Sequence, residues 1–287
     1  MMTIETLREV APAAFATKPL NTVSERQYTF MPTHELIDKL AKMNWMIHSA
    51  NQQKTKHEDR VNAVKHILHF RNPDFSFAKV GDTIPEILIV NSHDRTSSFR
   101  FYIGLFRLVC SNGLVVANGS LSEVQVPHIR TEYDFVKDQV IKITERVPSI
   151  LNRIEDFKKV SLDEAAKIAI AERSLAARFP EYVMDNGQID IPMIHEDVDI
   201  DAFLVPQRVE DADSSLWSTF NLVQEKIMKG GWVRETEKSR ALQETRLAKG
   251  FKDVKAERRV RKITNIGKNI QVNQDLWEIA DEYAKAY

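Results

Sequence analysis

Apolar and polar residues alternate with a period of two along several segments of the first 130 residues, which is typical of β-strands. One early segment, His34–Met43, instead places Leu36, Leu40 and Met43 on one helical face, with Thr33 as its expected N-cap. Short polar turns separate the extended segments, so they predict an antiparallel meander. These segments lie at 26–33, 45–53, 63–71, 84–94, 97–110, 114–117 and 122–129.

From Thr131 the apolar period becomes helical and continues to Val160, with a kink expected at Pro148. The stripe consists of Phe135, Val136, Val140, Ile143, Val147, Ile150, Leu151, Ile154 and Phe157. A capping box from Ser161 to Glu164 predicts a second helix, which ends near Phe179. Two more amphipathic helices are expected at 215–228 and 275–287, each with a Leu-Trp pair that serves as a docking anchor.

The pattern therefore predicts an α+β fold with an antiparallel β-meander and one early helix, followed by long helices and a helical C-terminal region. We expect a β-rich core with one helix over 1–130 and long helices that pack on the sheet over 131–179. An acidic linker is expected over 180–213, and C-terminal helices with a basic segment over 214–287.

The net charge of −1 hides a strong asymmetry between two neighbouring segments. Residues 181–213 carry ten acidic side chains and one basic one, whereas residues 226–268 carry fourteen basic and five acidic ones. One interpretation is a pair of solvated loops, or an acidic loop folded over a basic one. The other is a basic surface for polyanions, flanked or masked by the acidic segment.

Composition narrows the class of protein further. The hydrophobic content of 43% is ample for a packed core, and the chain has no apolar run long enough to span a membrane. The N-terminus lacks the features of a signal peptide, and a single cysteine cannot form an internal disulfide, so we expect a cytoplasmic protein. Phosphate-loop and Gly-x-Ser-x-Gly motifs are absent, and we expect no cofactor and assign no catalytic or metal-ligating residue.

Three groups of residues offered chemistry but favour a structural interpretation. Cys110 is followed by Asn112-Gly113, a strong signal for a two-residue hairpin turn, so the cysteine is expected beside a turn and not as a nucleophile. His66 and His69 lie three apart on a strand, so they point to opposite faces and cannot easily share a metal. The turn residues His93 and Asp94 would form a metal-binding cluster of the nuclease type only if the fold joined them to His128; the structural alternative is a turn aspartate with half-exposed histidines.

Arg100 and Arg107 lie in the most apolar strand and, being seven residues apart, on opposite faces. One of them must point to the more buried side of the sheet. A buried arginine needs a carboxylate or a phosphate, so this side chain belongs either to a structural Arg–Glu pair or to a nucleic-acid contact.

Several stretches together resemble a family of phage- and plasmid-like proteins whose domain has no assigned function. They are YTFMPTHELIDKL, VKHILHFR, LIVNSHDRTSSFRFYIGLFRLVCSNGLVV and PQRVEDADSSLWSTFNLVQEKIMKGG. The core of the resemblance, which extends over nearly the whole chain, is Arg107-x-x-Cys110-x-Asn112-Gly113. It implies a protein of mobile genetic elements, found among recombination genes.

A shorter stretch, ELIDKLAKMNWMIHSANQQ at 35–53, resembles the helix–Trp–strand segment of single-strand annealing recombination proteins. Trp45, His48 and Ser49 match in kind, whereas Asn44 replaces the glycine that precedes the tryptophan in that family. This resemblance implies a homo-oligomer with a basic groove for single-stranded DNA.

The leading hypothesis is a DNA-binding protein of mobile elements, with strand annealing as its specific form, in which cations neutralise phosphates and aromatic rings stack on bases. The alternatives are an inhibitor of a host defence system that acts through the acidic segment, and a metal-dependent nuclease. The candidate nucleic-acid contacts are Lys54, Lys56, Arg60, Lys65, Arg100, Arg107, Arg258, Arg259, Arg261 and Lys262.

Overall fold

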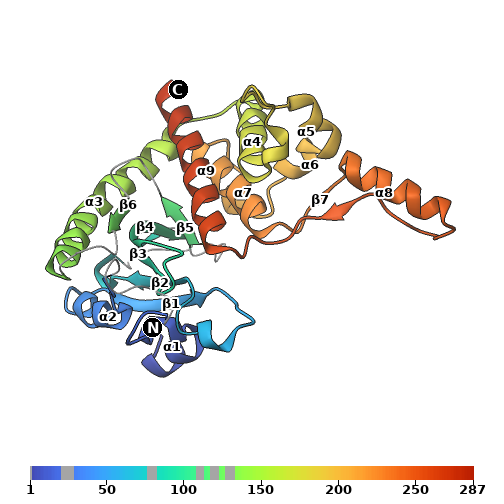
Figure 1. Cartoon of the computed structure of the whole chain (residues 1–287). Coiled ribbons are helices and arrows are strands. Elements are labelled where there is room, and N and C mark those ends of the chain that lie inside the picture. The colour runs from blue at the N-terminus through green and yellow to red at the C-terminus, as the bar shows by residue number, and fades with distance from the viewer. Residues whose placement is uncertain (1, 21–28, 76–82, 108–112, 117–122, 127–132) are drawn as a thin grey trace. The chain divides into compact units, whose positions relative to one another are not determined.

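A computed structural model describes the chain except for residues 1, 21–28, 76–82, 108–112, 117–122 and 127–132 (Figure 1). Its strands are β1 (Met46–Gln52), β2 (His66–Arg71), β3 (Thr83–Asn91), β4 (Phe99–Arg107), β5 (Gly113–Val116), β6 (Glu123–Val126), β7 (Val233–Arg234) and β8 (Arg258–Arg259). Its α-helices are α1 (Ile4–Val10), α2 (Thr33–Ala41), α3 (Tyr133–Lys159), α4 (Glu164–Arg178), α5 (Ile191–Asp197), α6 (Ile200–Leu204), α7 (Leu216–Lys229), α8 (Glu237–Ala248) and α9 (Ile266–Ala286). The α+β class predicted from the sequence is confirmed.

The chain divides into two compact units, which we describe separately. Unit 1 comprises Met1–Leu151 and Asn265–Ile270, and unit 2 comprises Asn152–Thr264 and Gln271–Tyr287. The first unit contains the large sheet, and the second consists mainly of helices.

The sheet of unit 1 is an antiparallel meander of β1 to β5, in which β6 also pairs with β4. Strand β4 is nine residues long, so β5 and β6 share the same strand, one opposite Ile103–Phe106 and the other opposite Phe99–Tyr102. The connection from β3 to β4 passes through His93–Thr96 as predicted, with Arg95 at φ 65°.

The hairpin from β4 to β5 differs from the expected one. The register pairs Phe106 with Gly113, which makes Gly113 a strand residue, so the predicted two-residue turn on Asn112-Gly113 is wrong. This register sets Leu114 opposite Leu105 and Val116 opposite Ile103, so apolar positions align across the pair. Cys110 lies outside the described residues.

One face of the sheet is covered by α1, α2 and the short helix η1 (Pro12–Phe15). The side chains of Leu68 and Phe70 on this face are buried, as are Leu36 and Leu40 of α2. Trp45, between α2 and β1, is 1% exposed and therefore belongs to the core.

The start of α2 corrects two expectations. Residues 29–32 form no strand, although a strand was expected over 26–33, and the N-cap of α2 is Pro32 rather than Thr33. Thr33 is the first helical residue, and its buried hydroxyl bonds to His66 Nε2 at 2.9 Å and accepts a hydrogen bond from Asn91 at 3.0 Å. The hydroxyl therefore satisfies buried polar groups of the sheet instead of the helix terminus.

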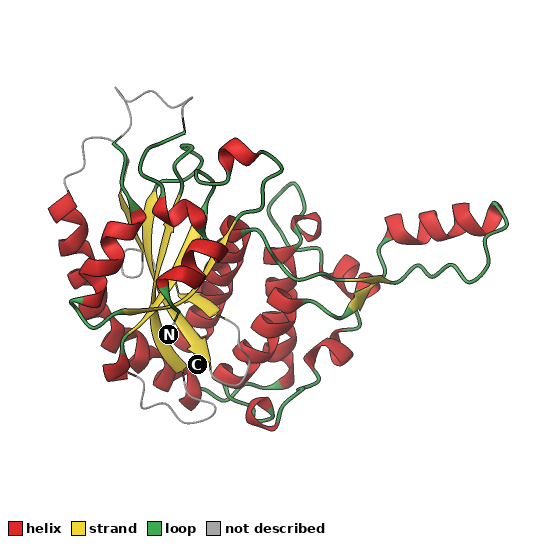
Figure 2. Ribbon diagram, turned by 90° about the horizontal axis from the view of Figure 1, so that it is seen from below, coloured by secondary structure: helices red, strands yellow, loops and turns green. Residues whose placement is uncertain are grey.

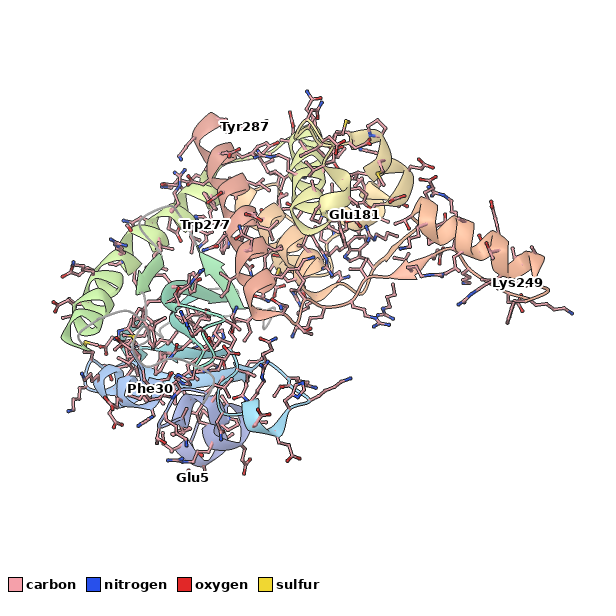
Figure 3. The ribbon with its side chains drawn as sticks, in the orientation of Figure 1. Glu5, Phe30, Glu181, Lys249, Trp277 and Tyr287 are labelled. Atoms are coloured by element: carbon pink, nitrogen blue, oxygen red, sulfur yellow. The ribbon has the colours of Figure 1, made fainter. Side chains whose placement is uncertain are left out.

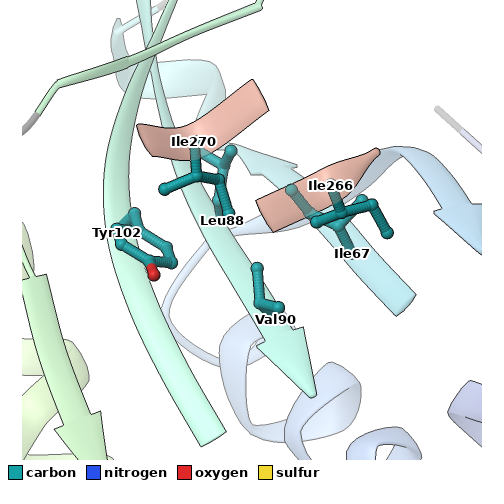
Figure 4. Packing of buried hydrophobic residues seen from close by; sticks show 6 residues of the cluster. All are labelled: Ile67, Leu88, Val90, Tyr102, Ile266 and Ile270. Carbon is teal, nitrogen blue, oxygen red and sulfur yellow. The ribbon is translucent and has the colours of Figure 1, made fainter. Parts of the chain in front are cut away.

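The opposite face of the sheet meets the first turns of α9. Figure 4 shows Ile266 and Ile270 of this helix over side chains of the three central strands, and all members of the cluster are buried. The sheet residues of the cluster are Ile67, Leu88, Val90 and Tyr102. The helix begins nine residues before the expected start at 275, because these two isoleucines extend its apolar stripe onto the sheet.

Unit 2 has an aromatic core. The ring of Phe157 lies 4.9 Å from that of Trp277 and 6.5 Å from that of Trp217, and Phe220 stacks on Trp217 at 5.7 Å. Both tryptophans are buried, which confirms that the two Leu-Trp pairs are docking anchors. Helix α7 is capped as predicted, by Gly230 with φ 67° at its C-terminus.

Two expectations for unit 2 are corrected: the residue that caps α4 and the structure of the acidic segment. Helix α4 is capped by Asp163, which accepts from the Ala166 amide, and not by Ser161, which pairs with Ser215 in an isolated bridge. The segment expected as an acidic linker contains α5 and α6, whose residues Ile194 and Phe203 are buried. The acidic segment is therefore part of the packed structure of unit 2.

Candidate nucleic-acid interface

The basic segment of the sequence forms an arm, which we define as residues 232–262. Strands β7 and β8 pair in two-residue register at its root, and α8 extends from them away from the other helices of unit 2 (Figures 1 and 2). The arm carries eleven basic and five acidic residues. Ser239 is the one described residue of α8 that is buried, so the helix is exposed on nearly every side.

Hydrogen bonds stiffen the arm in the absence of a core. Thr236 and Ser239 form a reciprocal capping box at the start of α8. Gln243 donates to the carbonyl of Val254 at 2.6 Å, which ties the returning chain to the helix. The backbone turns back at Gly250, which has φ 82°.

Two arginines at the root of the arm are paired with the acidic segment. Arg234 lies 2.9 Å from Glu181, and Arg240 lies 2.8 Å from Glu196 and 3.6 Å from Asp197. Burial raises the pKa of Asp197, although Tyr182 and Arg240 lower it. The acidic segment thus neutralises the root of the arm, in agreement with the interpretation of an acidic loop folded over a basic one.

The other nine cations of the arm form no ion pair within the part of the chain that the structure describes. Four of them lie on the returning strand and just after it, where Arg259, Arg261 and Lys262 are exposed and Arg258 is half-buried. Val260 between them is buried, and its amide donates to Trp232 at 2.8 Å. A buried anchor therefore holds four cations at the surface; we call Arg258, Arg259, Arg261 and Lys262 the return-strand patch.

The far end of the arm presents an exposed aromatic ring between two cations. Phe251 is 60% exposed, and Lys249 and Lys252 on either side of it are exposed as well. Figure 3 shows Lys249 at the end of the arm that is farthest from Glu181. We call Lys249, Phe251 and Lys252 the arm tip.

A second cationic group lies in unit 1, on the loop between β1 and β2. Lys54, Lys56 and Arg60 are exposed, and Lys65 is half-buried where the loop closes through a 2.8 Å bond from the Gln53 amide to its carbonyl. The loop and the arm belong to different units, so the described structure does not join these predicted contacts into one site.

The two arginines of β4 stand apart from these groups. Arg100 is half-buried and donates to the hydroxyl of Tyr102 at 3.3 Å, on the sheet face that α9 covers. Arg107 pairs with Thr83 in the ladder between β3 and β4, and its side chain lies outside the described residues.

The histidines predicted to diverge do so. His66 lies on the face covered by α2, whereas His69 is on the opposite face. His93 is fully buried and donates from Nε2 to the carbonyl of Ala13 at 3.0 Å. Asp94 accepts from the amide and hydroxyl of Thr96. His128 lies outside the described residues, so the alternative of a cluster with His93 and Asp94 stays a hypothesis.

A buried ion pair on the sheet was missed at the sequence level. Glu86 is 1% exposed and accepts from Arg71 at 2.6 Å and from His69 at 2.9 Å. Burial raises the pKa of the Glu86 carboxyl, but His69 and Arg71 outweigh this effect and hold the pKa below its usual value. The signal was a single carboxylate inside the apolar run IPEILIV, which requires a cation on the neighbouring strand.

Within the described ranges, no three His, Cys, Asp or Glu side chains are grouped in a way that could hold a metal ion. Among the helices that the structure describes, none combines the length and the apolar character that crossing a bilayer requires.

Comparison with known proteins identifies a family but no activity. Residues 19–249 match the model of a domain of unknown function, DUF932. Two relatives from Escherichia coli (strain K12), the UPF0380 proteins YafZ and YfjQ, are 32% and 31% identical over 284 residues, which is 98% of this chain and 90% of each relative. No solved structure matches. The expected family of unknown function is confirmed, whereas its link to mobile elements and the resemblance to annealing proteins stay predictions.

Proposed function

Because the chain belongs to the DUF932 family, a domain of unknown function, we propose a function from its own geometry: it binds single-stranded DNA through the arm. The return-strand patch supplies the phosphate contacts. The β1–β2 loop, with Lys54, Lys56 and Arg60, is a second and weaker contact. The expected role among mobile-element recombination proteins, with strand annealing as its specific form, is part of this proposal.

The observation that carries the proposal is the set of nine exposed or half-buried arm cations that form no ion pair among the described residues. Lysine and arginine side chains that form no intramolecular ion pair can replace the counterions of a nucleic acid without first losing such a pair. Their spacing along one extended element suits a backbone that is followed over several phosphates.

The alternatives have less support from the geometry. The DNA-mimic hypothesis relied on the charge of the acidic segment, and arginines of the arm neutralise part of that charge at Glu181, Glu196 and Asp197. The nuclease hypothesis relied on His93 and Asp94, and both already make intramolecular hydrogen bonds. We therefore keep DNA binding as the leading function.

Fluorescence anisotropy with a labelled oligothymidine and with a duplex of equal length tests the proposal. Affinity for the single strand should fall as salt rises, with a log–log slope of about −0.7 for each phosphate contacted. Replacing the whole return-strand patch with alanine should weaken binding and reduce the slope by roughly one unit or more.

The matched control also removes four cations from unit 2, but each of these is in an ion pair. The four are Lys158, Lys159, Lys167 and Lys285. Their replacement by alanine changes the net charge equally and should leave the slope close to that of the wild type. Absence of binding at low salt, or an equal loss in the two variants, would contradict the proposal.

A further inference from the structure

The arm tip is basic and carries an exposed aromatic ring. An acidic pocket lies at the root of the same arm. The pocket has a volume of about 590 Å³ and is lined by residues of α4, α5 and α6 and by residues at the root of the arm. Six carboxylates line it: Glu196, Asp197, Asp199, Asp201, Glu235 and Glu257. Its remaining lining includes apolar side chains, among them Ile168, Val198 and Ile200.

The acidic lining is only partly neutralised within the chain. Glu196 and Asp197 contact Arg240, and Arg234 of the lining is paired with Glu181. The carboxylates of Asp199, Asp201, Glu235 and Glu257 form no ion pair among the described residues. Five of the six carboxylates are exposed or half-buried, and Val198 and Ile200 are buried beside them, so the pocket presents negative charge next to apolar side chains, which suits an apolar group flanked by cations.

The arm tip has this composition and is held in a fixed turn. Phe251 stands between Lys249 and Lys252, and its amide donates to the carbonyl of Arg246 at 3.1 Å. The ring is thus exposed on an ordered turn. An exposed aromatic side chain of this kind is a frequent anchor of protein interfaces when it enters a pocket on the partner.

The tip cannot reach the pocket of its own chain while the arm keeps this form. Val233, Glu235 and Glu257 of the pocket belong to the root of the arm, and α8 with its twelve residues separates them from the tip by about 18 Å at 1.5 Å per residue. A nucleic acid is repelled by the acidic lining. The arm tip of another copy carries the positive charge that the pocket requires, and it is not held away from the pocket by α8 of the same chain.

We propose that this protein self-associates head to tail, with the arm tip of one copy seated in the acidic pocket of the next. Because the two surfaces differ, a pair of copies still has one free tip and one free pocket. Further copies can therefore add until the assembly closes into a ring or extends as a filament. The inference does not rest on DNA binding: of the nine arm cations that form no ion pair among the described residues it uses only Lys249 and Lys252, and it uses none of the return-strand patch.

Sedimentation velocity of the full chain without nucleic acid, over a range of protein concentrations and at low and high salt, is the first measurement. The wild type should form species larger than a dimer as concentration rises, and salt should weaken them. The tip variant combines Phe251→Ala with Lys249→Glu and Lys252→Glu, and the pocket variant combines Asp201→Lys with Glu257→Lys. Each alone should be monomeric.

Mixing the two variants provides the decisive result. The tip variant keeps an intact pocket and the pocket variant keeps an intact tip, so the mixture has one productive contact and should give a 1:1 dimer that does not grow further. The control, Lys158→Glu with Lys159→Glu, makes the same charge change as the two lysine substitutions of the tip variant, on exposed residues of α3, and should assemble as the wild type does.

A wild type that stays monomeric over the whole concentration range would overturn the proposal. Assembly that both variants retain would do so as well, and so would a mixture that yields no dimer. Circular dichroism of each variant verifies that it is folded, which is expected because the altered side chains are exposed. A wild type that assembles but does not bind DNA would count against the proposed function alone.

Discussion

Charged side chains play opposite parts in the sheet of unit 1 and in the arm of unit 2. In the sheet, Glu86 is almost fully buried and is paired with Arg71 and His69. In the arm, most cations are at the surface and form no ion pair among the described residues. A buried pair ties its members to the fold, whereas an exposed single charge is available to another molecule.

Uncharged polar groups buried in the sheet, like Glu86, have their partners within the fold. His66 accepts at Nε2 from the hydroxyl of Thr33, because its Nδ1 donates to the carbonyl of Val64 at 3.1 Å. Asn91 donates to the same hydroxyl and to the carbonyl of Met31. The arm has only Ser239 buried in α8, so its polar groups have little part in a core.

Glu86→Gln should have the largest effect on stability. It removes the charge that compensates Arg71 and His69 at a site with little water, and breaking a buried pair in this way costs about 3 kcal/mol. Urea unfolding at neutral pH, followed by circular dichroism, measures the change in the free energy of unfolding.

The same substitution at an exposed pair is the control. Glu155 lies 2.6 Å from Lys158 on α3, and both side chains are largely exposed. Glu155→Gln should lower the free energy of unfolding by less than about 0.5 kcal/mol. Equal losses at Glu86 and Glu155 would remove the distinction between buried and exposed charge.

The buried His66 should make stability depend on pH. Burial lowers its pKa from 6.5 to about 4, so at intermediate pH the unfolded chain binds a proton that the folded chain does not. The stability that the folded state gains from keeping His66 neutral is complete above pH 6.5 and is lost as pH falls toward 4. By linkage, the loss between pH 8 and pH 5 is about 2 kcal/mol.

Urea unfolding at a series of pH values, for the wild type and for His66→Gln, measures how much of the pH dependence of stability is due to His66. The variant has no imidazole at this position, so its free energy of unfolding should change less over the same interval, whatever its absolute stability. Parallel curves for the two proteins would show that His66 is not the group responsible.

The sequence predicted most of the sheet because period-two alternation and buried aromatic residues define a strand locally. It failed where distant residues decide the local structure. Thr33 looked like a helix cap, but His66 and Asn91 take its hydroxyl. Gly113 looked like part of a turn, but the pairing of β4 with β5 places it in a strand.

The candidate interface was predicted in composition but not in form. The charge count located the basic segment and the four residues of the return-strand patch. It did not reveal α8, because this helix has no apolar face and depends on the capping box of Thr236 and Ser239. The pairing of Arg234 with Glu181 joins residues 53 positions apart, and that of Arg240 with Glu196 joins residues 44 positions apart, which no local pattern encodes.

Replacing the return-strand patch with alanine should have the smallest effect on stability of the changes considered. Arg259, Arg261 and Lys262 are exposed and form no ion pair among the described residues, so their loss should change the free energy of unfolding by no more than about 0.5 kcal/mol. Val260 keeps its buried place and its hydrogen bond to Trp232, so the arm root stays intact. Urea unfolding of this variant belongs beside its DNA titration, because weak binding with unchanged stability assigns these cations to a ligand. A large loss of stability would instead place them with Glu86, as charges that hold the fold together.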